Sequence, residues 1–163
     1  MQLTRHTDYA LRVLIHLAVS PTNRATIGEI ADAYGLSRNH LMKVVHQLGQ
    51  GGFLDTQRGR NGGFSLARSP DHVTVGAVIR HTEPDMNLAD CGNCLLRPAC
   101  GLSGILKAAT AAFLAVLDRH SLADAARDKA GLAALIAALP GPAPSSSDGD
   151  DASSSSCPEP RPD

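Results

Sequence analysis

Residues 26–50 read TIGEIADAYGLSRNHLMKVVHQLGQ, two apolar-striped segments separated by one glycine turn. Thr26 followed three residues later by Glu29 is the capping-box pattern that begins a helix. Gly35 can adopt the left-handed conformation of a tight turn, so it ends that helix. Ser37 is placed to cap a second helix. Two short helices joined in this way are typical of a helix-turn-helix unit that binds DNA.

The second of these helices has one apolar face and one polar face. Its apolar residues recur at helical spacing and are Leu41, Val44, Val45 and Leu48. Its first turn is the end that usually meets base edges, where Arg pairs with guanine and Asn with adenine, while Lys suits phosphate. The candidate DNA-binding residues are therefore Ser37, Arg38, Asn39, His40 and Lys43. A small helical domain with a solvated face would share this pattern, and His40 would equally suit a packed position.

A glycine-rich turn follows, between two short segments of strand character. Asn61-Gly62 is a strong turn dipeptide, so residues 53–67 are predicted to form a β-hairpin. A hairpin directly after a helix-turn-helix is a wing. Its candidates for contact with phosphate or the minor groove are Arg58, Arg60 and Asn61. A nucleotide-binding loop is disfavoured, because the turn lacks a Lys-Ser/Thr ending and leads into a strand.

Helical periodicity predicts four further helices. The first spans about residues 4–19, another is capped by Thr74 and ends near Glu83, and an Ala-rich one runs from Ser121 to near residue 139. The clearest apolar stripe begins after Gly101 and spans about 18 residues. Its members are Leu102, Ile105, Leu106, Ala109, Phe113, Val116 and Leu117. This stripe needs a partner, either a second copy of the chain or its own first helix.

Charge is distributed unevenly along the 163 residues. Residues 1–70 carry eight Lys and Arg against four Asp and Glu, a modest basic balance that suits a polyanion. The segment 140–163 is rich in Pro, Ser, Asp, Gly and Ala, and we expect it to be disordered. Neither a long apolar run nor a secretory leader stands out, so the sequence predicts a cytoplasmic protein with no membrane partner.

Three cysteines crowd into residues 90–100, which read DCGNCLLRPAC. In a reducing cytosol, such clusters more often serve metal or redox chemistry than structural disulfides. The spacing of Cys91, Cys94 and Cys100 leaves three interpretations open: an iron–sulfur cluster, a zinc site completed by His81 or an Asp, and a regulatory disulfide without metal. No catalytic dyad or nucleotide-binding motif stands out, so an enzyme is not expected.

Four motifs together resemble the winged-helix iron–sulfur transcription regulators of bacteria, most closely their nitric-oxide-sensing repressors. They are MQLTRHTDYALR at 1–12, YGLSRNHLMKVV at 34–45, RGRNGG at 58–63 and PACGL at 98–102. The resemblance implies a [4Fe–4S] or [2Fe–2S] cluster held by the three clustered cysteines. The gap between Cys91 and Cys94 is shorter than is usual in that family, which leaves the number of irons open.

The resemblance also suggests how the site is completed and used. Asp8 of a partner subunit is implied as the fourth ligand, ahead of Asp90, His81 and Cys157. A homodimer would bind an inverted-repeat operator on double-stranded DNA and release it when nitric oxide reacts with the cluster or the cluster is lost. A regulator that senses iron–sulfur or redox status is one alternative. A zinc-stabilised winged-helix interaction module with no sensing role is another.

The resulting expectation is a mainly α fold with a small β-hairpin wing. A winged helix-turn-helix domain spans residues 1–81 and a cluster-binding loop spans 82–101. A dimerisation helix and the final helix occupy 102–139, and a disordered tail occupies 140–163.

Overall fold

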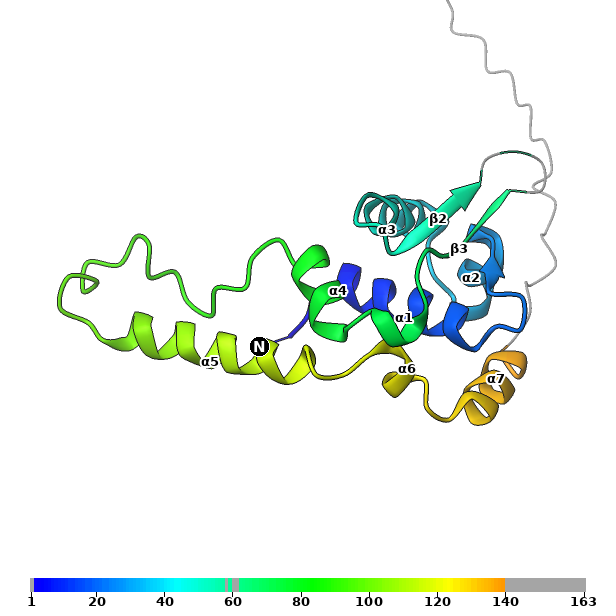
Figure 1. The fold of residues 1–163 in the computed structure, drawn as a ribbon. Helices are drawn as coiled ribbons and strands as arrows, with labels where there is room; N and C mark the ends of the chain where they lie inside the picture. Colours follow the sequence, from blue (N-terminus) through cyan, green and yellow to red (C-terminus); the bar gives the residue numbers. More distant parts are fainter. Residues whose placement is uncertain (1, 58, 60–61, 140–163) are drawn as a thin grey trace, which may run out of the picture.

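The computed structural model describes residues 2–57, 59 and 62–139 (Figure 1). The predicted wing residues Arg58, Arg60 and Asn61 lie outside the described residues. The segment 140–163, which includes Cys157 and for which disorder was predicted, also lies outside the described residues.

The first helix, α1 (Arg5–Val19), lies at the centre of the molecule. It begins at Thr4, whose hydroxyl accepts a hydrogen bond from the backbone N–H of Thr7 at 3.3 Å. One face of α1 is fully buried and consists of Ala10, Val13, Leu14 and Leu17. This face contacts α3, α4 and the C-terminal helices, so α1 is the element on which the rest of the fold packs.

The helix-turn-helix is confirmed as α2 (Ile27–Tyr34) and α3 (Arg38–Gln50). Thr26 and Glu29 form the full capping box at the start of α2. Gly35 follows with φ of 62°, a left-handed conformation that costs glycine little. Ser37 occupies the N-cap position of α3, but its side chain makes no capping hydrogen bond.

The wing is part of a three-stranded antiparallel sheet with the order β1-β3-β2. Its strands are β1 (Arg24–Ala25), β2 (Leu54–Gln57) and β3 (Gly63–Leu66). The hairpin of β2 and β3 confirms the predicted wing strands, with Leu54 opposite Leu66. Strand β1 was not expected, because two residues carry no alternation that a sequence pattern can detect.

Between residues 67 and 139, the structure shows a short 3₁₀ helix, η1 (Pro70–His72), and four α-helices. These are α4 (Val75–Thr82), α5 (Leu102–Leu117), α6 (Leu122–Ala125) and α7 (Lys129–Ala137). Thr74 caps α4 and Ser121 caps α6, as predicted. The prediction of a single final helix from Ser121 to near residue 139 is wrong, because two helices, α6 and α7, occupy this segment. The Asp128 side chain accepts a 2.9 Å hydrogen bond from the N–H of Gly131 and so begins a new helix there.

Helix α5 and the segment before it form an arm that projects from the rest of the protein (Figure 1). The buried core draws on α1, α2, α3, the sheet, α4 and α6, whereas α5 has no buried residue. We call residues 83–101, between α4 and α5, the cysteine loop. In the described part of the chain, no helix is long and apolar enough to cross a bilayer.

Candidate metal centre and nucleic-acid interface

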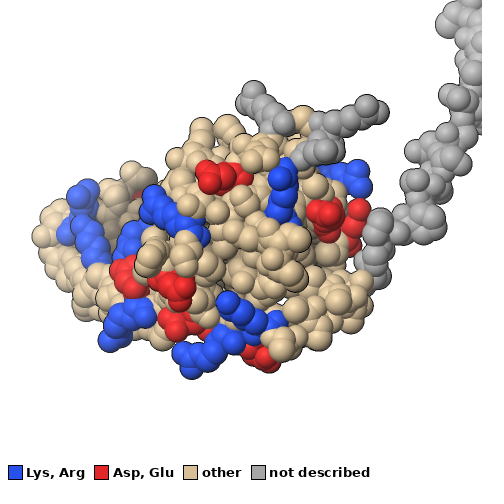
Figure 2. Space-filling view, turned by 45° about the vertical axis from the view of Figure 1, so that its right-hand side comes forward, with Lys and Arg blue, Asp and Glu red and all other residues tan. Residues whose placement is uncertain are grey.

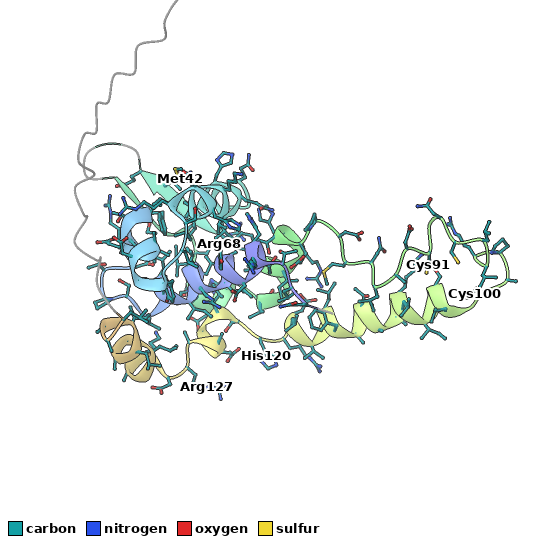
Figure 3. The ribbon with its side chains drawn as sticks, turned by 180° about the vertical axis from the view of Figure 1, so that it is seen from behind. Met42, Arg68, Cys91, Cys100, His120 and Arg127 are labelled. Atoms are coloured by element: carbon teal, nitrogen blue, oxygen red, sulfur yellow. The ribbon has the colours of Figure 1, made fainter. Side chains whose placement is uncertain are left out.

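The three clustered cysteines lie on the projecting arm, far from Met42 on α3 (Figure 3). All three are free thiols; Cys91 is partly buried, while Cys94 and Cys100 are exposed. Local polar contacts shape the cysteine loop, since the Asp90 carboxylate accepts hydrogen bonds from the backbone and the side chain of Asn93 at 3.1–3.4 Å. The loop therefore offers thiols that soft metals or oxidants can reach.

A groove of about 860 Å³ separates the first part of the cysteine loop from α5. Cys91 lines it on the loop side, together with apolar Met86 and Leu88. Leu106 and Lys107 line it on the helix side. Cys91 thus borders a partly apolar space whose lining also contains the Lys107 cation.

The donor chemistry of the loop fits a soft metal centre, although the side chains are not gathered. Among the residues that the structure describes, no three His, Cys, Asp or Glu side chains meet closely enough to hold a metal ion. The three thiols are nevertheless unpaired, within ten residues of each other, and accessible. Thiolates are the usual ligands of iron–sulfur clusters and common ligands of zinc, so both fit the residues present.

Each candidate for the fourth ligand that the structure describes already has a partner. The Asp8 carboxylate forms an ion pair with Arg12 one turn along α1, at 2.8 Å, with 45% of its side chain exposed. An exposed pair of this kind is worth at most about 1 kcal/mol, so Asp8 remains available to another cation. Asp90 holds Asn93 within the cysteine loop. His81 binds the C-terminal part of α3 and is the least available of the three.

The predicted DNA-binding side chains of α3 are mostly exposed. Arg38, Asn39 and Lys43 all face solvent. The Arg38 guanidinium lies 3.4 Å from the Asp32 carboxylate with 66% of its side chain exposed, a loose contact that leaves it free to reorient. We call α3 the reading helix.

Met42 is a residue of the reading helix that the sequence patterns did not single out. It is 52% exposed, and its position three residues after Asn39 places both on one face of the helix. An exposed thioether beside polar candidates is suited to contact with a thymine methyl group. The only available signal was an apolar residue outside the buried stripe of α3.

His40 lies against α1 and is half-buried. Its ring meets the edge of Tyr9 with centroids 5.0 Å apart, and it lies 5.8 Å from the ring of His6. His6 in turn has a buried Nε2 atom without a hydrogen-bond partner. The sequence left His40 either a DNA-contacting or a packed residue. The structure shows it in a packing contact between α1 and the reading helix.

Charged side chains of both signs alternate on the face drawn in Figure 2. Lys and Arg are interspersed there with Asp and Glu, so no large patch of one sign covers this face. On this face, attraction to a polyanion would come from a few placed cations rather than from a broad basic surface.

A winged helix-turn-helix with an exposed reading helix, joined to an arm that carries free thiols, defines a DNA-binding transcriptional regulator. The chain belongs to the Rrf2 family, described as iron-dependent transcriptional regulators, whose model matches residues 3–128.

Relatives and solved structures agree with this family. The chain is 50% identical over 130 residues to the HTH-type transcriptional regulator NsrR of Bacillus licheniformis, covering 76% of this chain and 91% of that protein. It is 44% identical over 142 residues to NsrR of Bacillus subtilis, covering 83% and 97%. Its fold is similar to CymR, the global cysteine regulator of B. subtilis, with a TM-score of 0.60, 25% identity and coverage of 78% and 98%. It is also similar to T. potens IscR, with a TM-score of 0.63, 24% identity and coverage of 78% and 88%.

Proposed function

We propose that this protein is a homodimeric repressor that carries an iron–sulfur cluster and releases its operator in response to nitric oxide. Two observations support the proposal. The relatives named NsrR match most of the chain at 44–50% identity. The motifs of the reading helix and the cysteine loop resemble nitric-oxide-sensing repressors.

The observation that carries the proposal is the placement of the thiols. Cys91, Cys94 and Cys100 are unpaired on an arm outside the core, where no structural task occupies them. The chain enters this arm directly from α4, whose last turn contacts the reading helix. A centre built on these thiols would therefore be attached to the DNA-binding unit through the first residues of the cysteine loop.

The residues that would hold a cluster are the three cysteines and, from a second subunit, Asp8. A cluster bound there would supply iron that nitric oxide can ligate. Asp8 would exchange its Arg12 partner for this role, at a cost no larger than that of an exposed ion pair. Because a carboxylate binds iron less tightly than a thiolate, such a site would be more reactive than one with four cysteines.

A second subunit would also cover the apolar side of α5. Leu102, Ile105 and Val116 are 49%, 66% and 46% exposed in the single chain. An apolar helix face is normally buried against a partner, so this exposure favours contact with a second subunit. Pairing along α5 gives a two-fold dimer with two reading helices. Such a dimer recognises an inverted repeat with half-sites about 34–36 Å apart.

The test is purification without oxygen, followed by quantitation of iron, sulfide and zinc and an absorption spectrum. We expect brown protein with equal iron and sulfide, and operator binding that nitric oxide abolishes. Colourless protein with one zinc per chain would instead support the zinc-stabilised module. Coloured protein whose operator binding ignores nitric oxide would contradict the proposed signal.

The role of Asp8 is tested separately with Asp8→Ala. We expect an altered cluster spectrum and a cluster that is lost faster to chelators, because one ligand is replaced by water. Arg12→Ala is the matched control, since it removes the same ion pair but keeps the carboxylate. An unchanged spectrum in Asp8→Ala would exclude the carboxylate as a ligand.

A further inference from the structure

We infer that His81 is a positioning residue that transmits the state of the cysteine loop to the reading helix. The inference rests on the proposed function, because it names the contact through which the loop acts on DNA binding. It is carried by a pair of hydrogen bonds between α4 and α3 and by the attachment of the loop just beyond them.

His81 and Gln47 hold each other through two reciprocal hydrogen bonds. The His81 Nε2–H donates to the backbone carbonyl of Gln47 at 2.7 Å. The Gln47 side-chain amide donates to the backbone carbonyl of His81, also at 2.7 Å. Because the acceptor of the first bond is a carbonyl, the neutral ring must carry its proton on Nε2. Residues 34 positions apart are thus joined by side chain and backbone in both directions.

The first of these bonds adds a second donor to a carbonyl at the end of the reading helix. The last carbonyls of a helix lack partners within it, and the Gln47 carbonyl receives the Gly51 N–H at 3.0 Å together with the His81 ring. The ring fits only because residue 51 is glycine, since a Cβ there would lie 2.6 Å from His81 Nε2. The Phe53 ring packs against the His81 ring, with the two ring centroids 5.4 Å apart. His81 is therefore fixed in position.

The cysteine loop begins two residues after His81 and is tied to α1 at that point. The Glu83 carboxylate accepts hydrogen bonds from the backbone N–H of Thr4 at 2.8 Å and from its hydroxyl at 3.2 Å. Thr82 between them is buried, with its hydroxyl bonded to the Val78 carbonyl. A change in the conformation of the loop would therefore displace Glu83, which is bonded to the start of α1, and His81, which is bonded to α3.

The reading helix can carry this displacement to the DNA. It has 13 residues and spans about 20 Å, so it moves as one rigid body. His81 holds its C-terminal end, while Arg38 and Asn39 lie at the end that faces bases. A small tilt at the His81 end changes the angle at which these side chains approach DNA. Without the two hydrogen bonds, the reading helix would no longer follow the loop.

The test uses the full-length protein with His81→Leu and His81→Gln. Leu keeps an apolar contact with Phe53 but cannot donate, whereas the Gln amide can replace the Nε2–H. His72→Leu, at an exposed position in η1, is the control for loss of a histidine. Operator dissociation constants are measured for the cluster-loaded and the cluster-free form of each protein. We expect the ratio of the two constants to fall to within about twofold of one in His81→Leu, and to be retained in His81→Gln and His72→Leu. An unchanged ratio in His81→Leu overturns the inference.

A second readout does not depend on the cluster. The loop cysteines are alkylated with iodoacetamide in a Cys157→Ser background, and amide hydrogen exchange is followed at residues 48–53. In the parent protein we expect exchange to become about tenfold faster after alkylation, as the loss of a hydrogen bond of ordinary strength would produce. In His81→Leu we expect exchange that is already fast and insensitive to alkylation.

The two readouts separate the inference from the proposed function. If the parent protein binds its operator equally well with and without a cluster, the proposed function fails, and the exchange experiment still decides on His81. A response to alkylation that requires His81 supports the inference. The same response in the parent and in His81→Leu, or no response in the parent, overturns it.

Discussion

Side chains at the start of the reading helix divide between solvent-exposed and packed positions. Arg38, Asn39 and Lys43 are exposed, whereas His40 is half-buried against Tyr9. The sequence order places all four together, but neighbouring residues on a helix point about 100° apart. One of them must therefore face the core side of α3, and the structure shows that it is His40.

Asn39→Ala tests base recognition at this end. We expect operator binding to weaken by about 1–3 kcal/mol with little change for random DNA, because a bidentate Asn–adenine pair discriminates by that amount. Competition binding on both DNA sequences measures the difference. Lys43→Ala is the matched comparison and should reduce the salt slope by about one unit on either DNA. Equal losses on both DNAs would place Asn39 in a non-specific role.

His16 makes stability depend on pH. Burial lowers the pKa of His16 below its ordinary value, against a smaller opposite effect of the Glu29 carboxylate. Its ring also lies 3.4 Å from the Tyr34 hydroxyl. The unfolded chain then binds a proton more readily than the folded one. The contribution of neutral His16 is complete above about pH 6.5 and is lost as the pH falls below that value.

Urea unfolding between pH 7.5 and 5.5 checks this expectation. The parent protein should lose more stability on acidification than His16→Gln, whose side chain does not titrate in this range. His72→Gln, at an exposed position, should lose as much stability on acidification as the parent protein does. If the free energy of unfolding depended on pH in the same way in the parent and in His16→Gln, the role of His16 would be contradicted.

At the scale of elements, the junction of α4 with α5 decides where the arm points. Arg80 of α4 donates two hydrogen bonds to the Asp118 carboxylate at the end of α5, at 2.6 and 2.5 Å. These side-chain hydrogen bonds hold the pKa of Asp118 below its ordinary value, so the pair persists until the pH falls into the acidic range of carboxylates. Backbone pairing of Thr74 with Ser121 fixes the same junction. The arm is thus anchored at the C-terminal end of α5.

Gly76→Ala should disturb this junction. A Cβ on Gly76 would collide with the Asp118 carboxylate and lie 3.0 Å from the Asp118 backbone nitrogen. We expect a loss of about 1–3 kcal/mol in the free energy of unfolding, measured by urea titration with circular dichroism. Gly104→Ala on α5 is the control, because its added Cβ would meet no atom within 4 Å beyond the adjacent residues and backbone of its own helix. It should be neutral or stabilising by up to about 1 kcal/mol. Equal effects of the two substitutions would exclude a close contact at Gly76.

At the scale of the whole molecule, the described chain is a compact DNA-binding unit with a projecting arm. Helix α5 contacts mainly α4, has no buried residue, and leaves Leu102, Ile105 and Val116 exposed. The alternative in which α5 packs on the first helix of its own chain does not account for this exposure. A second copy of the chain is the partner that the proposed function requires.

Ile105→Asp tests the dimer. Ile105 is 66% exposed in the single chain, so a charge there costs little in a monomer and several kcal/mol once it is buried between subunits. We expect sedimentation to show monomers and operator affinity to fall at least tenfold. Leu135→Asp on α7, where the side chain is 68% exposed, is the matched control and should remain dimeric. A dimeric Ile105→Asp protein would place the interface elsewhere.

The sequence by itself determined the elements whose signals are local. Capping boxes, the Gly35 turn, helical stripes and the glycine-rich hairpin act within a few residues, so the winged helix-turn-helix and α5 could be predicted. The clustered thiols were equally visible, because metal-ligand spacing is a property of the chain. Among local features, the interruption of the final helix at Asp128 and the 3₁₀ helix η1 were missed.

The tertiary structure alone decided the contacts between distant residues. Strand β1 exists because β3 is there to pair with it, and His40 is packed because α1 crosses the reading helix. The bonds of Gln47 with His81 and of Thr4 with Glu83 join residues 34 and 79 positions apart. A single sequence contains no periodicity that relates such pairs. They form because burial of apolar faces brings whole elements together, and polar side chains then pair with whatever lies opposite.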